Sequence, residues 1–499
     1  MVFTSWAFVR FFLVVLIGLS VMRTRTLRQL VLLVASAFFY GYWNVWYLPL
    51  LATPALIDYY CALRIDATED PLLRKRWLLV SLVTNLGLLG YFKYAAFFAT
   101  NIAALLGRPI PHLDILLPVG ISFYTFKTLS YTIDVYRRDI PVCRKVWQYT
   151  MFVMYFPELV AGPIVRASVF LPQMRRSLRP SWPRAIVGLQ VVLLGVTKKL
   201  LIADRLAVLV DPVFAAPRAY SQATVASALV AYSLQIYCDF SGYSDIAIGI
   251  SRIIGFDLPE NFNMPYLATS ITDFWRRWHM TLSAWLRDYL YIPLGGNRRG
   301  RIRTYVNLTL TMLLGGLWHG ANWTFVGWGL LHGIGLAVHK ALAPRLAWWT
   351  HWTRAIAGWL VTYAFVCLAW VFFRATTFAD ALIVLRKIAG LEPGGVQWHY
   401  SPLFMLLPLV VLAHAIGAYV AFRERNYATA GGKVPPPPLL RGVYERARSR
   451  FAVRPHRAAG VYALLPVGTF AGALILTIWM VGLFLLASTR TSPFIYFRF

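Results

Sequence analysis

Apolar runs of about 20 residues recur along the whole chain, and each is long enough to cross a hydrocarbon core of roughly 30 Å as an α-helix. Only 14% of the 499 residues are charged, whereas soluble globular proteins have about 25%. A water-exposed surface of this size cannot be built from such a composition. The sequence therefore predicts an all-α fold, a polytopic bundle of transmembrane helices.

Lysine and arginine residues indicate how the predicted spans are oriented. The chain has 49 of them against 20 Asp and Glu, and most lie in short loops between apolar runs. The loops 23–28, 64–76 and 134–148 are rich in them, which predicts that these loops are cytoplasmic and that the N-terminus lies outside. Basic loops beside membrane spans indicate contact with anionic membrane lipids, so we do not expect nucleic acid as a partner.

The apolar pattern predicts about 11 to 12 spans. They are residues 6–22, 28–43, 47–63, 77–99, 113–133, 185–209, 222–250, 304–318, 322–339, 355–373, 402–421 and 463–487. The stretch 149–170 breaks the alternation, because it contains Pro157 and Pro163 and is followed by several arginines that a complete span would place outside. We expect a re-entrant segment here, which is tolerated at depth only inside protein or beside a cavity.

Two polar stretches separate the later spans. The insert 251–303 is rich in arginine and is expected in the cytoplasm, and the basic loop 423–462 contains a proline tract, 435–438, typical of a stiff linker. The four cysteines are scattered and form no CxxC or CxxH spacing, so neither a disulfide framework nor a metal site is predicted.

His319 is surrounded by glycine and tryptophan in the segment 313–323. Counting from Arg303 at the cytoplasmic end, a helical rise of about 1.5 Å per residue places His319 beyond the membrane midplane. An ionisable group at this depth indicates a functional site. The alternative is a structural histidine at a helix hairpin.

His279 lies in the insert, where the segment 272–289 has helical periodicity. A single helix here would place Trp275, His279, Leu282 and Leu286 on one face. The spacing alone favours a packed core histidine over a catalytic one.

Further polar groups lie on either side of His279. Arg298, Arg299 and Arg301 follow two glycines, and such loops bind phosphates through guanidinium and backbone N–H groups, although a solvated basic loop is the alternative. A GxGxxG or Walker motif is absent, so the sequence does not support an ATPase. Asp239 and Asp245 lie in or at the end of an apolar run, where carboxylates must pair or face water. They would pair with arginines of the insert or line a substrate path.

Several long motifs, taken in order, resemble those of the membrane-bound O-acyltransferase family. The motifs are residues 90–94, 117–124, 134–137, 156–163, 240–249, 260–262, 274–279, 287–298, 315–322 and 494–499. Within the family, the chain is most similar to the membrane subunits of bacterial alginate O-acetylation. The resemblance covers 1–390, which we expect to form the acyltransferase core, and the last six residues. The part 391–499 would add C-terminal spans and the basic loop.

The resemblance implies transfer of an acyl group, usually acetyl, from cytoplasmic acetyl-CoA through a central tunnel to an acceptor beyond the bacterial inner membrane. The implied acceptor is an exopolysaccharide such as alginate or a periplasmic acetyltransferase partner, and no permanently bound cofactor is expected. It also implies that His319 is the catalytic histidine and His279 a second motif histidine. At position 158 this chain has Glu, where relatives often have His or Gln.

The mechanism that follows makes His319 the general base on an acceptor hydroxyl. The phosphates of acetyl-CoA would lie near Arg298, Arg299 and Arg301, and His279 would orient the donor or stabilise the oxyanion. Residues expected to line the tunnel or orient the substrates are Asn322, Trp318, Asp239, Tyr243 and Trp278. The alternatives are a transporter or exporter of acylated precursors and a family member with a different acceptor.

Overall fold

The computed structural model describes residues 1–109, 113, 115–159, 162–176, 178–344, 351–429, 470–487 and 494. Helices account for nearly all of the regular structure in these ranges, which contain no strand beyond one isolated bridge between Tyr220 and Val396. The predicted all-α class is confirmed.

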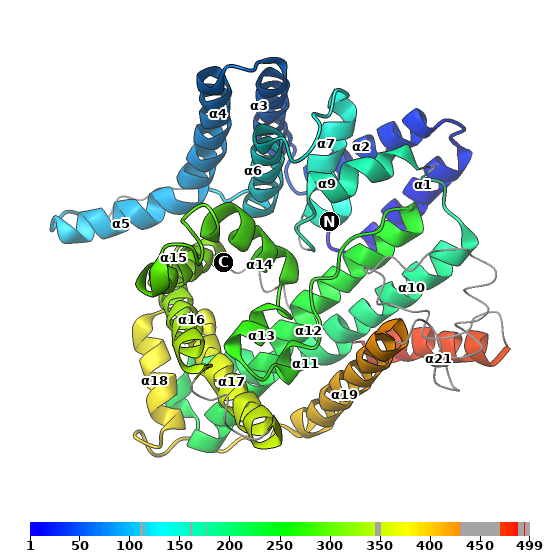
Figure 1. Cartoon of the computed structure of the whole chain (residues 1–499). Helices are drawn as coiled ribbons and strands as arrows, with labels where there is room; N and C mark the ends of the chain where they lie inside the picture. Colours follow the sequence, from blue (N-terminus) through cyan, green and yellow to red (C-terminus); the bar gives the residue numbers. More distant parts are fainter. Residues whose placement is uncertain are drawn as a thin grey trace.

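The N-terminal helices pack around one continuous hydrophobic core. They are α1 (Trp6–Val21), α2 (Arg25–Gly41), α3 (Tyr47–Ala67), α4 (Pro71–Leu89) and α6 (Ile121–Arg137), whereas α5 (Ala95–Leu105) contributes no residue to this core. The helices α3, α4 and α6 lie side by side, and α5 leaves α4 at a sharp angle (Figure 1). The bend falls at the π-helix η1 (Gly90–Tyr94), so the helix expected over 77–99 changes direction within its length. The helix expected from 113 begins only at Ile121.

The stretch 149–170 is broken, as the prolines predicted. It contains the end of α7 (Val146–Met154), then α8 (Phe156–Leu159) and α9 (Ala167–Phe170), with 163–166 outside any helix. A 3-10 turn, η2 (Leu171–Arg175), follows. The side chains of α8 are all buried, which satisfies the requirement that a broken segment lie inside protein. Its re-entrant course through a membrane stays a prediction.

The longest helix, α12 (Gln222–Ile254), crosses the middle of the fold (Figure 1). It packs along α10 (Trp182–Val196), the π-helix η3 (Thr197–Ala203) and α11 (Asp204–Ala215). Glycines face each other across the contact. A Cβ on Gly195 would lie 2.5 Å from the carbonyl oxygen of Gly242, and one on Gly188 would lie 2.6 Å from that of Gly249. The two helices therefore touch backbone to backbone.

The insert and the C-terminal half surround a second, aromatic-rich core with most of their elements. Their elements are η4 (Pro217–Ala219), η5 (Pro265–Leu267), α13 (Ile271–Trp275), α14 (Met280–Leu286), the π-helix η6 (Arg287–Tyr291), α15 (Gly300–His319), α16 (Trp323–Leu342), α17 (His351–Arg374), α18 (Phe378–Ile388), α19 (Ser401–Thr429) and α21 (Phe470–Leu486). Residues 282–290 pack instead in a smaller cluster with α6, and residues 476–483 pack on α10. The single helix expected over 272–289 is wrong, because His279 has a left-handed conformation (φ 40°) that separates α13 from α14. Helix α18 has no counterpart among the expected spans.

Four helices in the described ranges are long and apolar enough to cross a membrane. They are Pro71–Leu105, Trp182–Ala215, Trp323–Leu342 and Thr353–Arg374, and shorter apolar helices lie at Trp6–Val21, Ser401–Gly417 and Gly472–Leu486. The membrane character of the fold is thus confirmed, whereas the count of about 11 to 12 spans stays a prediction. So does the division of the chain at 390. Most of the basic loop 423–462, with its proline tract, lies outside the described residues, and α19 extends past the expected span end to Thr429.

Candidate active site

The helices α15 and α16 form a tight hairpin that carries His319 at its turn. His319 is the last residue of α15, and α16 begins four residues later at Trp323. A Cβ on Gly329 would lie 2.4 Å from the carbonyl oxygen of Met312, so the two helices are in backbone contact. This contact leaves little freedom in where the end of α15 lies.

The imidazole of His319 is enclosed by aromatic rings. Its side chain is buried, and its ring centroid lies 5.0 Å from that of Trp318, 5.1 Å from that of Trp328 and 5.2 Å from that of Phe373. All three contacts are edge-on. An apolar enclosure of this kind disfavours the charged form of an imidazole.

Lys93 closes the end of α15. Its Nζ donates to the carbonyl oxygens of Trp318 and His319 and to Oγ of Ser122, while the hydroxyl of Tyr94 donates to the carbonyl oxygen of Leu317 at 2.9 Å. The last carbonyls of a helix have no partner within it, so these side chains satisfy groups that would otherwise be buried and unpaired. In the sequence, Lys93 stands out only as part of the motif 90–94, and nothing in its spacing predicts this role.

His279 is also buried and lies near the same tryptophan. Its Nδ1 is 3.0 Å from Oδ1 of Asn261, and the edge of its ring meets the ring of Phe240 at a centroid distance of 4.7 Å. Its ring centroid is 6.3 Å from that of Trp318. The structure therefore places His319 and His279 on the same tryptophan, although spacing alone favoured a core role for His279.

Asn322 holds the hairpin turn. Its Oδ1 accepts the N–H of Thr324 at 3.0 Å, which caps the start of α16, and its Nδ2 donates to the carbonyl oxygen of Thr376 at 2.9 Å. Both ends of the amide thus bind backbone groups. Trp278 lies in the aromatic core among Phe262, Phe274 and Trp370.

Asp239 and Asp245 pair with two consecutive lysines of η3. Lys199 lies 2.6 Å from Asp239 and 2.8 Å from Asp204, and Lys198 lies 2.7 Å from Asp245. The expectation that arginines of the insert would be their partners is wrong, because η3 packs along α12 and brings its lysines to the two carboxylates. Tyr243 covers the ammonium group of Lys199 at 5.8 Å from its ring centroid. The contacts of Asp239 and Tyr243 join η3 to α12.

Glu158 forms a buried ion pair with Lys127 of α6. The Nζ–Oε2 distance is 2.7 Å, and the side chains are 3% and 0% exposed. The rings of Phe152 and Phe170 flank the same ammonium group at 4.8 and 5.8 Å. The pair fixes the broken segment against α6.

Arg298, Arg299 and Arg301 are exposed beside the start of α15. Asn307 anchors the preceding loop by donating from Nδ2 to the carbonyl oxygen of Gly296 at 3.1 Å. From this loop to His319 the helix spans about 28 Å at its usual rise. The arginines and His319 therefore lie at opposite ends of α15.

A charged network joins the motifs 134–137 and 287–298 to Arg166. Arg166, which lies in the broken stretch 149–170, pairs with Asp288, and the hydroxyl of Tyr289 donates to Oδ1 of Asp134 at 2.7 Å. Partial burial raises the pKa of Asp288, but hydrogen bonds from Arg287 and Arg166 outweigh this effect and hold it below its usual value. The network ties α6 and the broken segment to η6.

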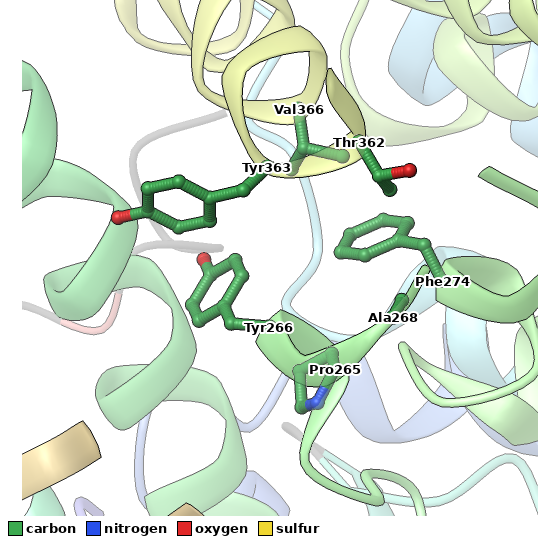
Figure 2. A pocket seen from close by; sticks show the side chains of 7 residues that line it. All are labelled: Pro265, Tyr266, Ala268, Phe274, Thr362, Tyr363 and Val366. Atoms are coloured by element: carbon green, nitrogen blue, oxygen red, sulfur yellow. The ribbon is translucent and has the colours of Figure 1, made fainter. Parts of the chain in front are cut away.

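The described residues also border a shallow hollow between η5 and α17 (Figure 2), which has no room for a water molecule. Its lining residues are Pro265, Tyr266, Ala268, Phe274, Thr362, Tyr363 and Val366. Tyr266 and Phe274 also contact Trp278, so the hollow lies beside the aromatic core, and His319 does not line it. The central tunnel stays a prediction. Among the described residues, no three His, Cys, Asp or Glu side chains gather as they would around a metal ion.

The sequence comparisons identify the family. Residues 144–379, which include both histidines and the three arginines, match the membrane-bound O-acyltransferase family. The chain is 40% identical over 509 residues to a probable alginate O-acetylase of Pseudomonas putida, and the match covers 100% of both chains. The chain belongs to the membrane-bound O-acyltransferase family. It is therefore an acyltransferase, and the transport alternative has no comparable support.

Two other relatives in this family differ in the acceptor that their names state. A peptidoglycan O-acetyltransferase of Helicobacter pylori is 41% identical over 392 residues, covering 73% of this chain and 74% of the relative. A teichoic acid D-alanyltransferase of Bacillus subtilis is 26% identical over 308 residues, covering 56% and 75%. Members of the family thus differ in both acyl group and acceptor.

Proposed function

We propose that this acyltransferase moves acetyl groups from cytoplasmic acetyl-CoA across the bacterial inner membrane to an exopolysaccharide such as alginate, or to a periplasmic acetyltransferase that modifies it. The full-length similarity to alginate O-acetylases supports acetyl as the group and polysaccharide as the acceptor. The D-alanyltransferases match at lower identity and over less of the chain.

The observation that carries the proposal is the enclosure of His319 by three aromatic rings at the end of α15. A neutral imidazole is the form that accepts a proton. In the proposed reaction His319 takes the proton of the acceptor hydroxyl, and the hydroxyl oxygen bonds to the acetyl carbon. The carbon–sulfur bond then breaks, and the thiolate of CoA takes up the proton.

The exposed arginine loop would bind the other end of the donor. Arg298, Arg299 and Arg301 supply guanidinium groups suited to the phosphates of CoA. The thioester would then have to reach along α15 toward His319. His279 and Trp318 complete the proposed site, and Asn322 positions the turn that carries His319.

The test is thiol release from labelled acetyl-CoA by the purified protein in lipid nanodiscs, with alginate or peptidoglycan fragments as acceptors. Wild type should release CoA and label the acceptor, and His319→Ala should lose at least 100-fold in rate, within the range that general base catalysis supplies. His414→Ala, which removes a buried histidine of α19, is the control. Full activity of the His319 variant would exclude the proposal. Labelling of peptidoglycan but not of alginate would identify peptidoglycan as the acceptor.

A further inference from the structure

Asn261 is a buried residue between α12 and η5, and three nitrogen or oxygen atoms converge on its Oδ1. They are Nδ1 of His279 at 3.0 Å, Oγ1 of Thr281 at 2.9 Å and the backbone N of Thr281 at 3.4 Å. Its Nδ2 faces Oγ of Ser244 at 3.3 Å. The backbone of Asn261 takes part as well, because its carbonyl oxygen accepts the N–H of Met280 at 2.9 Å.

These contacts fix which atoms carry hydrogens. The N–H of Thr281 only donates, and the hydroxyl of Thr281 already accepts the N–H of Ile164 at 2.9 Å, so its own hydrogen is directed at Asn261. Both donors require an acceptor, which makes the converging atom the amide oxygen. An amide oxygen 3.0 Å from Nδ1 of His279 in turn requires a hydrogen on that nitrogen.

The other ring nitrogen of His279 is then determined. A neutral imidazole carries one hydrogen, so Nε2 has a lone pair and no proton. Nε2 is buried and has no hydrogen-bond partner among the described residues. The left-handed backbone at His279 and the edge contact with Phe240 hold the ring in place. A buried acceptor without a partner costs about 1–3 kcal/mol, and a bound donor would remove this cost.

We propose that Asn261 is a positioning residue that holds His279 as the Nδ1–H tautomer, so that Nε2 accepts a hydrogen bond from a bound substrate. The inference rests on the proposed function and deepens it. A bare Nε2 cannot donate to an oxyanion, so of the two roles expected for His279, orienting a substrate is the one that the geometry favours.

Two groups of the proposed substrates supply such a donor. One is a neighbouring hydroxyl of a polysaccharide acceptor, other than the hydroxyl whose proton His319 takes, and the other is an amide N–H in the arm of acetyl-CoA that carries the thioester. The thioester itself has no N–H or O–H. Separate KM values for the two substrates distinguish these sources.

The experiment compares Asn261→Asp, Asn261→Leu and Ser244→Ala with wild type, measuring thiol release against pH in nanodiscs. Asp keeps an oxygen at the position and adds a charge that favours protonated His279, so the acid limb of the kcat/KM profile should move to higher pH by about one unit. Asn261→Leu should lose at least tenfold in kcat/KM. Ser244→Ala disturbs only the other end of the amide and should keep the wild-type pH profile.

The outcomes separate this inference from the proposed function. A raised KM for acetyl-CoA alone in the Asn261 variants assigns Nε2 to the donor arm, and a raised KM for the acceptor alone assigns it to the hydroxyl. An Asn261→Asp profile that coincides with that of wild type overturns the inference, even if Asn261→Leu fails to fold. Absence of thiol release by wild type would instead overturn the proposed function.

Discussion

The ammonium group of Lys93 lies 3.3 Å from the carbonyl oxygen of His319, although 226 positions separate the two residues in the chain. The lysine comes from the π-helix at the bend between α4 and α5, and the histidine ends α15. A distant bend thus holds in place the helix end that carries the proposed base. Ser122, at the start of α6, accepts from the same ammonium group at 3.1 Å.

Replacing Lys93 should release the C-terminal end of α15 from the bend between α4 and α5. Lys93→Met keeps the length of the side chain but leaves two helix-end carbonyls without their donor, so we expect thiol release to fall at least tenfold. Hydrogen bonds to charged groups contribute about 1.5–3 kcal/mol each, so the thermal unfolding midpoint should also fall. Lys75→Met, at an exposed position of α4, is the control, and equal activities of the two variants would contradict the prediction.

The buried ion pair of Lys127 and Glu158 should lose more stability when one partner is removed than when both are removed. Lys127→Met or Glu158→Leu alone leaves one charge unpaired, and the expected loss is about 3–5 kcal/mol in the free energy of unfolding. The double variant removes both charges and should recover most of that loss. Denaturant unfolding in detergent gives the comparison, and a double variant less stable than either single one would refute this account.

The contact of α15 with α16 should not tolerate a methyl group. Gly329→Ala places a Cβ 2.4 Å from a backbone oxygen, so we expect a loss of about 1–3 kcal/mol and a displaced His319. Gly87→Ala is the matched control, because a Cβ on this helical glycine meets nothing within 4 Å. Similar unfolding midpoints for the two variants would contradict the prediction, because they would show that the hairpin accommodates the added methyl group.

The arginine loop should determine binding of the donor. Single changes to Gln at Arg298, Arg299 or Arg301 should raise KM for acetyl-CoA several-fold and leave kcat nearly unchanged, because these groups lie about 28 Å from His319. Arg276→Gln removes an exposed charge elsewhere in the insert and serves as control. A lowered kcat with an unchanged KM would place the donor phosphates elsewhere.

Local sequence patterns predicted most helices correctly. They failed where a residue outside the segment binds the backbone N–H groups that would otherwise continue a helix. The helix expected over 6–22 is observed at Trp6–Val21, and the prolines correctly predicted the break in 149–170. The periodicity of 272–289 is helical, yet the N–H groups of Met280 and Thr281 bind Asn261 instead of extending α13. No spacing within the segment contains that information.

Long-range pairs account for what the sequence did not predict at the site. The resemblance implied both histidines, but Lys93 reaches His319 from 226 positions away, and Asn261 reaches His279 from 18 positions away, outside the expected helix. The lysine partners of Asp239 and Asp245 depend on the packing of η3 against α12. One missed element did have a local signal, since Thr377 caps α18 and its hydroxyl accepts the N–H of Asp380.

The paired glycines of α10 and α12 bear on how molecules reach the buried histidines. Where Gly195 meets Gly242 and Gly188 meets Gly249, the separation is too small even for a methyl group. Neither a lipid tail nor an acyl chain fits through such a seam, so no sideways route from the bilayer passes between these two helices. Because α10 and α12 are in direct backbone contact here, substrates must reach the buried histidines by a path that does not pass between these two helices.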